Sequence, residues 1–306
     1  MAIFNLKQGK LSQIKEISFV LEKDIQKIVE DNIHSLFGLE FVASELSLDG
    51  LRVDTLSFDI ESKSFVIIEY KKDRNFTVID QGYAYLALLL NNKADFILLY
   101  NENMNKSLRK NYIDWSQCRI IFVSPNFTNY QMKAIEFKDL PIELWEIKRY
   151  ANDLVSLNQI QTHQKSGSIM DLSQKTEVMK KVNREVKVYN EDELLLQTTE
   201  KLQNLYKELK DSILSIATDI EVRPKAKYIA FVRKNNFVEI TFFKSSLKLY
   251  LNIKNNQLND PRQMARDVSK IGHWGTGNYE IILKDSDNIG YVLSLIRQAY
   301  DQINVY

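Results

Sequence analysis

Asp54, Glu69 and Lys71 are ionisable residues in two segments that otherwise show the pattern of core-facing β-strands. Side chains alternate across a strand, so Asp54 shares a face with Phe58, while Glu69 and Lys71 continue the face of Ile67. An unpaired charge is costly to bury, so a carboxylate on an apolar strand face pairs with a cation or binds a metal. Two interpretations are therefore open: a structural salt bridge from Lys71 to one of the acids, or a metal-dependent centre.

Two helical segments place further polar groups at the same position. On a helical wheel Glu22 falls inside the apolar stripe of the helix expected at 12–37 and should point inward, whereas Glu30 lies at the edge of that stripe. Gln81 and Tyr85 are four residues apart on a second helix and therefore share one face. Polar groups from two helices and two strands are thus expected to converge, which favours a functional site.

The elements that must position these residues follow an αβββαβ order, which predicts an α/β fold. Their signals are helical and alternating spacings of apolar residues, with turn residues between the segments. We expect helices at 12–37, 78–90, 104–115 and 129–137, and strands at 40–46, 51–60, 64–71, 95–100, 119–124 and 142–147.

The length of 306 residues predicts two domains. Residues 152–187 are polar, contain Ser-Gly-Ser at 166–168 and lack a sustained apolar period, so we expect a linker there between domains at 1–151 and 188–306. The second domain is expected to be a smaller α+β unit. It should contain helices at 192–217 and 288–303 and strands at 228–233, 237–243, 247–253 and 279–283.

Composition and apolar runs exclude several classes of protein. No apolar run approaches the roughly 18 residues that a membrane span needs. The single cysteine, Cys118, cannot form an intramolecular disulfide, and the chain does not begin with a signal-peptide pattern. We therefore expect a cytoplasmic protein without a membrane partner.

The chemistry-bearing residues together resemble the PD-(D/E)XK nuclease superfamily, in its RecB-like and NucS-like branch. Its signature is an Asp followed by Glu-x-Lys on the next strand, which Asp54 and residues 68–71 match. Residues 81–85 match the Gln-x-x-x-Tyr motif of that branch, and Glu22 matches its helical acidic residue. The Pro that often precedes the first acid is Val53 here. The ordered set spans about half the chain and is more specific than the short motif alone.

The resemblance implies a restriction-endonuclease-like core with a mixed sheet and a metal-dependent deoxyribonuclease. Oxygen ligands from Asp54 and Glu69 suit Mg²⁺ or Mn²⁺, with Glu22 and Tyr70 as further metal contacts. Lys71 would orient water or stabilise negative charge. The implied catalytic set is Glu22, Asp54, Glu69, Lys71, Gln81 and Tyr85.

DNA is the expected substrate, with RNA and the choice between internal and terminal cleavage left open. A competing interpretation is a nuclease-like fold kept as a nucleic-acid-binding or regulatory protein without cleavage. Basic residues that would contact phosphates are Lys72, Arg74 and Lys93 near the motif, and Lys225, Lys227, Lys244 and Lys248 in the basic stretch 221–254. The alternative for that stretch is a solvated sheet face.

The second domain resembles an uncharacterised domain that accompanies nuclease-like domains and is sometimes labelled only a predicted transport protein. Residues 267–277 and 293–300 carry this resemblance. Transport has no support, since no segment can span a bilayer. His273 and Trp274, between glycines, suggest a loop that holds a nucleotide or a protein partner; the alternative is a tight turn with Trp274 in the core. A homodimer is a further hypothesis.

Overall fold

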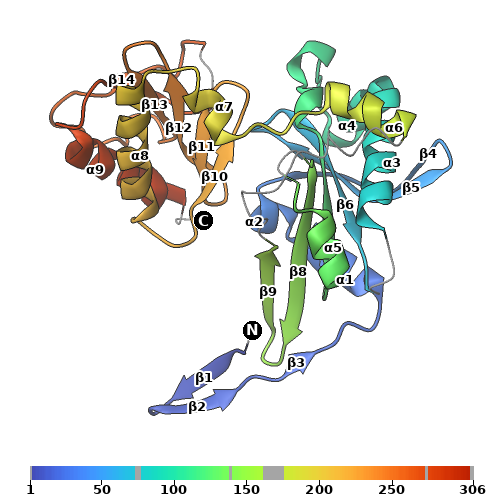
Figure 1. Cartoon of the computed structure of the whole chain (residues 1–306). Helices are drawn as coiled ribbons and strands as arrows, with labels where there is room; N and C mark the ends of the chain where they lie inside the picture. Colours follow the sequence, from blue (N-terminus) through green and yellow to red (C-terminus); the bar gives the residue numbers. More distant parts are fainter. Residues whose placement is uncertain (1, 73–76, 138–139, 161–175, 273–274, 304–306) are drawn as a thin grey trace. The chain divides into compact units, whose positions relative to one another are not determined.

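The computed structural model describes residues 2–72, 77–137, 140–160, 176–272 and 275–303. The chain divides into two compact units, Met1–Val188 and Tyr189–Tyr306 (Figure 1). Each contains its own sheet and its own helices, so the expected α/β core followed by a smaller α+β domain is confirmed.

The first unit is built on a mixed sheet with the order β3-β8-β7-β6-β5-β4, and β9 pairs with β8. The neighbours β4, β5 and β6 are antiparallel, whereas β6, β7 and β8 are parallel. The strands are β3 Glu16–Ile17, β4 Glu40–Leu48, β5 Leu51–Asp59, β6 Ser64–Tyr70, β7 Arg119–Ser124, β8 Ile142–Tyr150 and β9 Leu154–Gln159. A separate hairpin consists of β1 Phe4–Lys7 and β2 Lys10–Gln13.

Alternation along β6 divides the interior of this unit into two cores. Ile67 faces a cluster that includes Leu86 of α3, and Ile68 faces a cluster that includes Ile25 and Val29 of α1. A strand buried on both faces shows a continuous apolar run, as β6 does. The helices are α1 Glu22–Asp31, α2 Ile33–Phe37, α3 Val78–Asn91, α4 Lys93–Met104, α5 Asn129–Ala134 and α6 Glu177–Glu185, with 3₁₀ turns at Lys110–Tyr112 and Trp115–Gln117.

Three predicted elements of the first unit are wrong. The helix expected at 12–37 is replaced by strand residues as far as Ile17 and then by α1 and α2, because Asn32 leaves the helical conformation with φ −129° and ψ 16°. The strand expected at 95–100 lies in α4, where Phe96 and Tyr100, four residues apart, face the core. The helix expected at 104–115 does not form, since Asn105 ends α4 in the left-handed conformation.

The expected linker, 152–187, is largely part of the first unit. β9 pairs with β8, and α6 packs against α3. The Tyr83 hydroxyl donates a hydrogen bond to Asn183 Oδ1 at 2.9 Å, and Val182 is buried. Thr176 caps α6 by accepting from the Met179 amide at 3.2 Å. In sequence this stretch resembles a linker because its elements are short and contain too few apolar residues to show a sustained period. The boundary between the two units falls after Val188.

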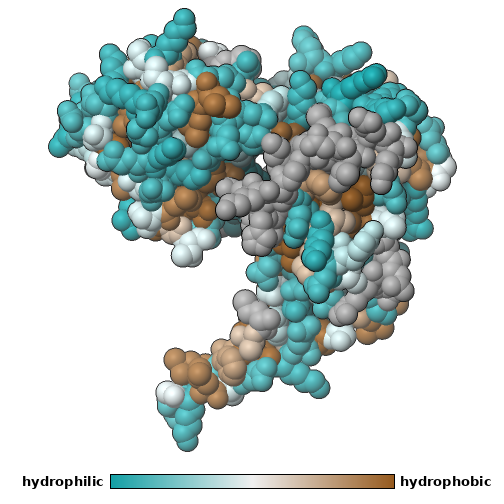
Figure 2. Space-filling model, in the orientation of Figure 1, coloured by the Kyte–Doolittle hydropathy of each residue, from teal (hydrophilic) through white to brown (hydrophobic). Residues whose placement is uncertain are grey.

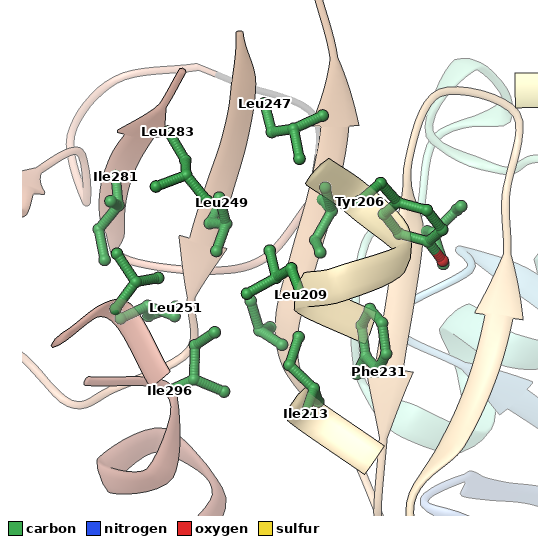
Figure 3. Packing of buried hydrophobic residues seen from close by; sticks show 14 of the residues in the cluster. Tyr206, Leu209, Ile213, Phe231, Leu247, Leu249, Leu251, Ile281, Leu283 and Ile296 are labelled. Carbon is green, nitrogen blue, oxygen red and sulfur yellow. The ribbon is translucent and has the colours of Figure 1, made fainter. Parts of the chain in front are cut away.

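The second unit has an antiparallel sheet with the order β10-β11-β12-β13-β15-β14. Its strands are β10 Glu221–Pro224, β11 Ile229–Val232, β12 Asn236–Phe242, β13 Leu247–Leu251, β14 Arg266–Asp267 and β15 Tyr279–Leu283. Figure 3 shows Leu209 and Ile213 of one helix and Ile296 of another over Leu249 and Leu251 of β13. The helices are α7 Glu191–Leu195, α8 Glu200–Leu214 and α9 Ile289–Gln302, so the helix expected at 192–217 is interrupted at 196–199.

Within the described ranges, no helix has both the length and the apolar character needed to cross a membrane.

A buried carboxylate anchors the glycine-rich segment of the second unit. Glu239 of β12 is fully buried, and its Oε1 accepts from the amide and hydroxyl of Thr276 at 2.9 and 2.7 Å. Its Oε2 accepts from the Gly277 amide at 3.1 Å. A Cβ added at Gly277 would lie 2.6 Å from the carbonyl carbon of Tyr250 and 2.8 Å from the amide nitrogen of Leu251. Glycine is therefore needed for close backbone packing here.

Gly277→Ala should destabilise the second unit by about 1–3 kcal/mol, because the added methyl group meets backbone atoms that cannot rotate away. Hydrogen exchange of peptides that span β13 and β15 measures the effect on the intact chain. Gly272→Ala is the matched control, since a Cβ at Gly272 meets nothing within 4 Å. Equal protection in the two variants would contradict this account of the segment.

Candidate active site

Asp54 and Glu69 lie on adjacent strands at the point where the apolar face of the sheet ends. β5 and β6 are antiparallel, and Thr55 is paired with Ile68, so Asp54 lies across from Glu69. The backbone amide of Tyr70 donates to Asp54 Oδ2 at 3.0 Å, which fixes the Asp54 carboxylate against β6. The strand pairing thus brings the two acids together, as alternation predicted.

The Glu69 carboxylate is held by one of its two oxygens. Lys71 Nζ donates to Glu69 Oε1 at 2.7 Å, and Gln81 Nε2 donates to the same oxygen at 3.1 Å. Glu69 is only 3% exposed, and its Oε2 is buried without a hydrogen-bond partner in the part of the chain that the structure describes. A buried acceptor without a donor costs free energy, so this oxygen is the feature of the site that needs an explanation.

Helix α3 supplies Gln81 and Tyr85 from one face. Besides its hydrogen bond to Glu69, Gln81 Nε2 donates to the Tyr85 hydroxyl oxygen at 3.2 Å. The Tyr85 hydroxyl in turn donates to the backbone carbonyl of Arg52 at 2.9 Å. The pair therefore connects α3 to both β5 and β6. The structure brings these two residues to Glu69, where the spacing of four residues placed them.

Glu22 does not point inward, contrary to the sequence prediction. It is exposed in the first turn of α1, because that helix begins at Glu22 instead of a full three turns earlier. Its Oε2 accepts from the backbone amide of Lys72 at 2.8 Å. Its charge is among the influences that raise the pKa of Asp54, so it lies at the rim of the same site.

The Tyr70 side chain lies on the opposite face of the sheet from Glu69, so only the backbone of Tyr70 could supply the predicted metal contact. Its hydroxyl is 3.0 Å from Thr55 Oγ1, which donates to Glu30 Oε1 at 2.5 Å. Alternation along β6 requires this, since Glu69 and Tyr70 are consecutive. Only the backbone of Tyr70 reaches Asp54.

Gln26 is a site neighbour that the sequence analysis missed. Its Nε2 donates to the backbone carbonyl of Asp54 at 3.3 Å and to Glu30 Oε1 at 3.0 Å. The same nitrogen donates to Ser44 Oγ at 3.0 Å. Gln26 and Glu30 are four residues apart, a spacing that would have placed both on one face once the start of α1 was known.

Burial raises the pKa values of both acids above their ordinary range. For Asp54 desolvation is the largest cause, opposed by the hydrogen bond from the Tyr70 amide and by the charge of Lys71. For Glu69 desolvation is again the largest cause, followed by the charge of Asp54, while Lys71 opposes both. A raised pKa means that the ionised pair is destabilised, so a cation bound at this position would gain free energy from it.

The donor set fits a hard divalent cation. No group of three or more His, Cys, Asp or Glu side chains is arranged to hold a metal within residues 2–72, 77–137, 140–160, 176–272 and 275–303. Mg²⁺ is commonly bound through one or two carboxylates and keeps several waters, so a larger cluster is not required. Asp54 and the unpartnered Oε2 of Glu69 are the oxygens that would hold it.

The predicted phosphate-binding residues are dispersed. Lys72 is exposed beside the site, whereas Lys93 forms an ion pair with Glu185. In the second unit Lys248 forms an ion pair with Glu280 at 3.1 Å. Two of the remaining predicted cations, Lys225 and Lys227, lie in the β10–β11 turn, and Lys244 lies in the β12–β13 turn. Because Ile229 at the start of β11 pairs with Ile240 near the end of β12, these two turns lie at the same end of the sheet. Arg74, His273 and Trp274 lie outside the described residues.

Comparison with known proteins gives a relative over nearly the whole length. An uncharacterised protein of Haemophilus influenzae is 44% identical over 299 residues, which cover 98% of this chain and 99% of that protein. The chain belongs to the family of that protein. Residues 191–303 also match a domain described as Domain of unknown function (DUF5655), and this match falls within the second unit. No solved structure matches the chain.

Asp54→Asn should stabilise the metal-free protein at neutral pH. The folded-state pKa of Asp54 is raised above 3.8, so proton binding favours the folded state below that value, and this contribution is lost as the pH rises through the folded pKa. Asn keeps an oxygen for the Tyr70 amide and carries no charge. Urea unfolding in EDTA should show the variant gaining on the wild type from about pH 4 to pH 7. Equal stabilities across that range would contradict the assigned strain at this carboxylate.

Proposed function

We propose that the first unit is a metal-dependent nuclease that hydrolyses phosphodiester bonds in DNA. The observation that carries this proposal is Glu69: a carboxylate buried at the end of an apolar strand face, with one oxygen oriented by Lys71 and Gln81 and the other unpartnered within the described residues. Asp54 lies across from it on the next strand. The unused oxygen and the raised pKa values of the two acids support a cation site in addition to the salt bridge with Lys71.

The chain's own residues divide the work of the site. Asp54 and Glu69 would hold Mg²⁺ or Mn²⁺, which supplies positive charge for the phosphate and acidifies water when bound. Gln81 fixes the Glu69 carboxylate from α3, and the amide of Tyr70 fixes that of Asp54. Glu22 at the rim would order water around the ion. The acids are thereby held in one geometry before substrate arrives, which reduces the cost of reorganisation.

Lys71 is the cation of the site, and its side chain is 19% exposed. Its backbone amide donates to the Val123 carbonyl at 3.0 Å, so the residue continues the pairing of β6 with β7 and its position is fixed. Because the Lys71 side chain is partly exposed, its ammonium could move from Glu69 Oε1 to an incoming phosphate oxygen or to the attacking water. This supports a role in placing water and stabilising developing charge.

We propose DNA as the substrate because the ordered set of site residues resembles that of the PD-(D/E)XK nucleases. We also propose that the protein is cytoplasmic. Incubation of the chain with single-stranded, duplex and branched DNA in Mg²⁺ or Mn²⁺, with EDTA controls, tests the activity directly. Metal-dependent binding without cleavage of any of these DNAs would favour the alternative, a nuclease-like protein that binds nucleic acid without hydrolysing it.

Asp54→Ala and Glu69→Ala should each abolish metal-dependent cleavage while the chain stays folded, because each change removes a metal ligand and little core volume. Gel assays of DNA cleavage measure the activity, and circular dichroism checks the fold. Glu208→Ala, which removes an exposed carboxylate of α8, is the matched control and should cleave normally. Full activity in either site variant would refute the mechanism.

Lys71→Ala should retain metal binding and lose most turnover, by about 10²–10³-fold for the loss of one charge-stabilising group. Isothermal titration with Mn²⁺ separates the two effects, since the metal affinity should stay close to that of the wild type. A large loss of Mn²⁺ affinity would instead assign Lys71 to holding Glu69 in place.

A further inference from the structure

A cavity of about 480 Å³ opens in the first unit at the far end of β5 from Asp54. Phe58, which lines it, follows Asp54 by four residues on β5, or about 13 Å at the usual rise of an extended strand. Both side chains face the α3 side of the sheet, and the covered core lies between them. The cavity is thus a separate feature from the candidate active site.

Aromatic and aliphatic side chains form the floor and one wall of this cavity. Phe58 and Tyr100 are buried, with ring centroids 4.8 Å apart, and form the floor. Tyr112 and Ile60 also line the cavity and are 45% and 46% exposed. They offer an accessible ring and an accessible aliphatic surface to a flat, apolar group.

The remaining wall is basic. Lys106 is fixed there by Glu40 Oε1 at 2.6 Å and by the Tyr100 hydroxyl at 3.1 Å. Arg109 is exposed and forms no ion pair within the described parts of the chain. Lys63 Nζ lies 5.0 Å from the centre of the Tyr112 ring. Two cations therefore line the cavity, Lys106 paired with Glu40 and Arg109 without an ion pair in the described residues, and Lys63 lies nearby over the Tyr112 ring.

We propose that this cavity binds a nucleotide, with the base stacked on Tyr112 against Ile60 and the phosphate held by Lys106 and Arg109. A planar ring joined to an anion is the chemistry that matches an exposed aromatic side chain beside Arg109, which has no carboxylate partner in the described residues, and Lys106, whose ammonium is held at the cavity wall by Glu40. The nucleotide could be free or part of a single strand of DNA. The site does not depend on hydrolysis, because none of its residues belongs to the candidate active site.

Isothermal titration calorimetry of the full chain in EDTA tests this with two probes, thymidine 5′-monophosphate and a short unlabelled oligothymidylate. Tyr112→Ala and Arg109→Gln should each weaken binding by about five- to a hundredfold, as expected for the loss of one stacked base or one charged contact. Tyr112→Phe should retain most of the affinity because it keeps the ring.

Two matched controls report on non-specific effects. Tyr130→Ala removes a tyrosine that is 83% exposed on α5, and Arg297→Gln removes an exposed arginine of α9; neither should change the affinity. The titrations are made in EDTA, where metal-dependent cleavage does not take place, so a failure of the proposed hydrolysis leaves this result unaffected.

The two probes identify the source of the nucleotide. Binding of the monophosphate that depends on Tyr112 and Arg109 indicates a site for a free nucleotide, whereas such binding of the oligothymidylate alone indicates a site for a strand. The proposal is overturned if neither probe binds, or if both bind equally well to the wild type, Tyr112→Ala and Arg109→Gln.

Discussion

The burial of two carboxylates on neighbouring strands is the constraint around which the first unit is organised. Desolvation is the largest cost of ionising Asp54 and Glu69, and the charge of Asp54 adds to the cost at Glu69. The fold offsets part of that cost with the Lys71 ammonium, the Gln81 amide and one backbone N–H, each from an element fixed by its own apolar packing. Glu69 Oε2 has no hydrogen-bond donor within the described residues, which lowers the stability of the folded chain. A cation bound at this oxygen would restore that stability.

The sheet acts as a partition that lets the two faces do different work. On the α3 face lie the acids and their cation, while on the α1 face Thr55, Tyr70 and Glu30 form a hydrogen-bonded chain that Gln26 extends to the backbone of Asp54. This second network clamps β5 to β6 from behind. A shift of one residue in the pairing of β5 with β6 would move Glu69 to the other face of the sheet. The network on the α1 face therefore preserves the geometry of the acids on the α3 face.

Sequence alone located those parts of the fold and site that depend on local periodicity. Alternation along β6 and the four-residue spacing of Gln81 and Tyr85 were sufficient to predict that these two side chains meet Glu69 on one face of the sheet. The position of Glu22 required knowledge of where α1 begins, and the residues before α1 pair with the distant β8, a contact that local periodicity does not reveal. The apolar pattern of the segment 95–100 fits a strand and a helix equally well. The packing of Phe96 and Tyr100 against Phe65 decides in favour of the helix. Helix α6 was missed because the few core residues in and directly after it, Met179, Val182 and Val186, stand in a polar stretch and complete the core around α3 without forming one of their own.

The second unit supplies an internal standard for judging Glu69. Glu239 is also a glutamate on a central strand and is more deeply buried, yet both of its oxygens accept hydrogen bonds, from Asn236, Thr276 and Gly277. A carboxylate whose purpose is to hold a loop is expected to have this full complement, because each missing donor costs stability without return. Glu69, also buried at 3% exposed, accepts two hydrogen bonds on one oxygen and none on the other within the described residues. The same chain thus shows how a structural buried acid is satisfied, and the departure at Glu69 supports the proposal that this acid binds a cation.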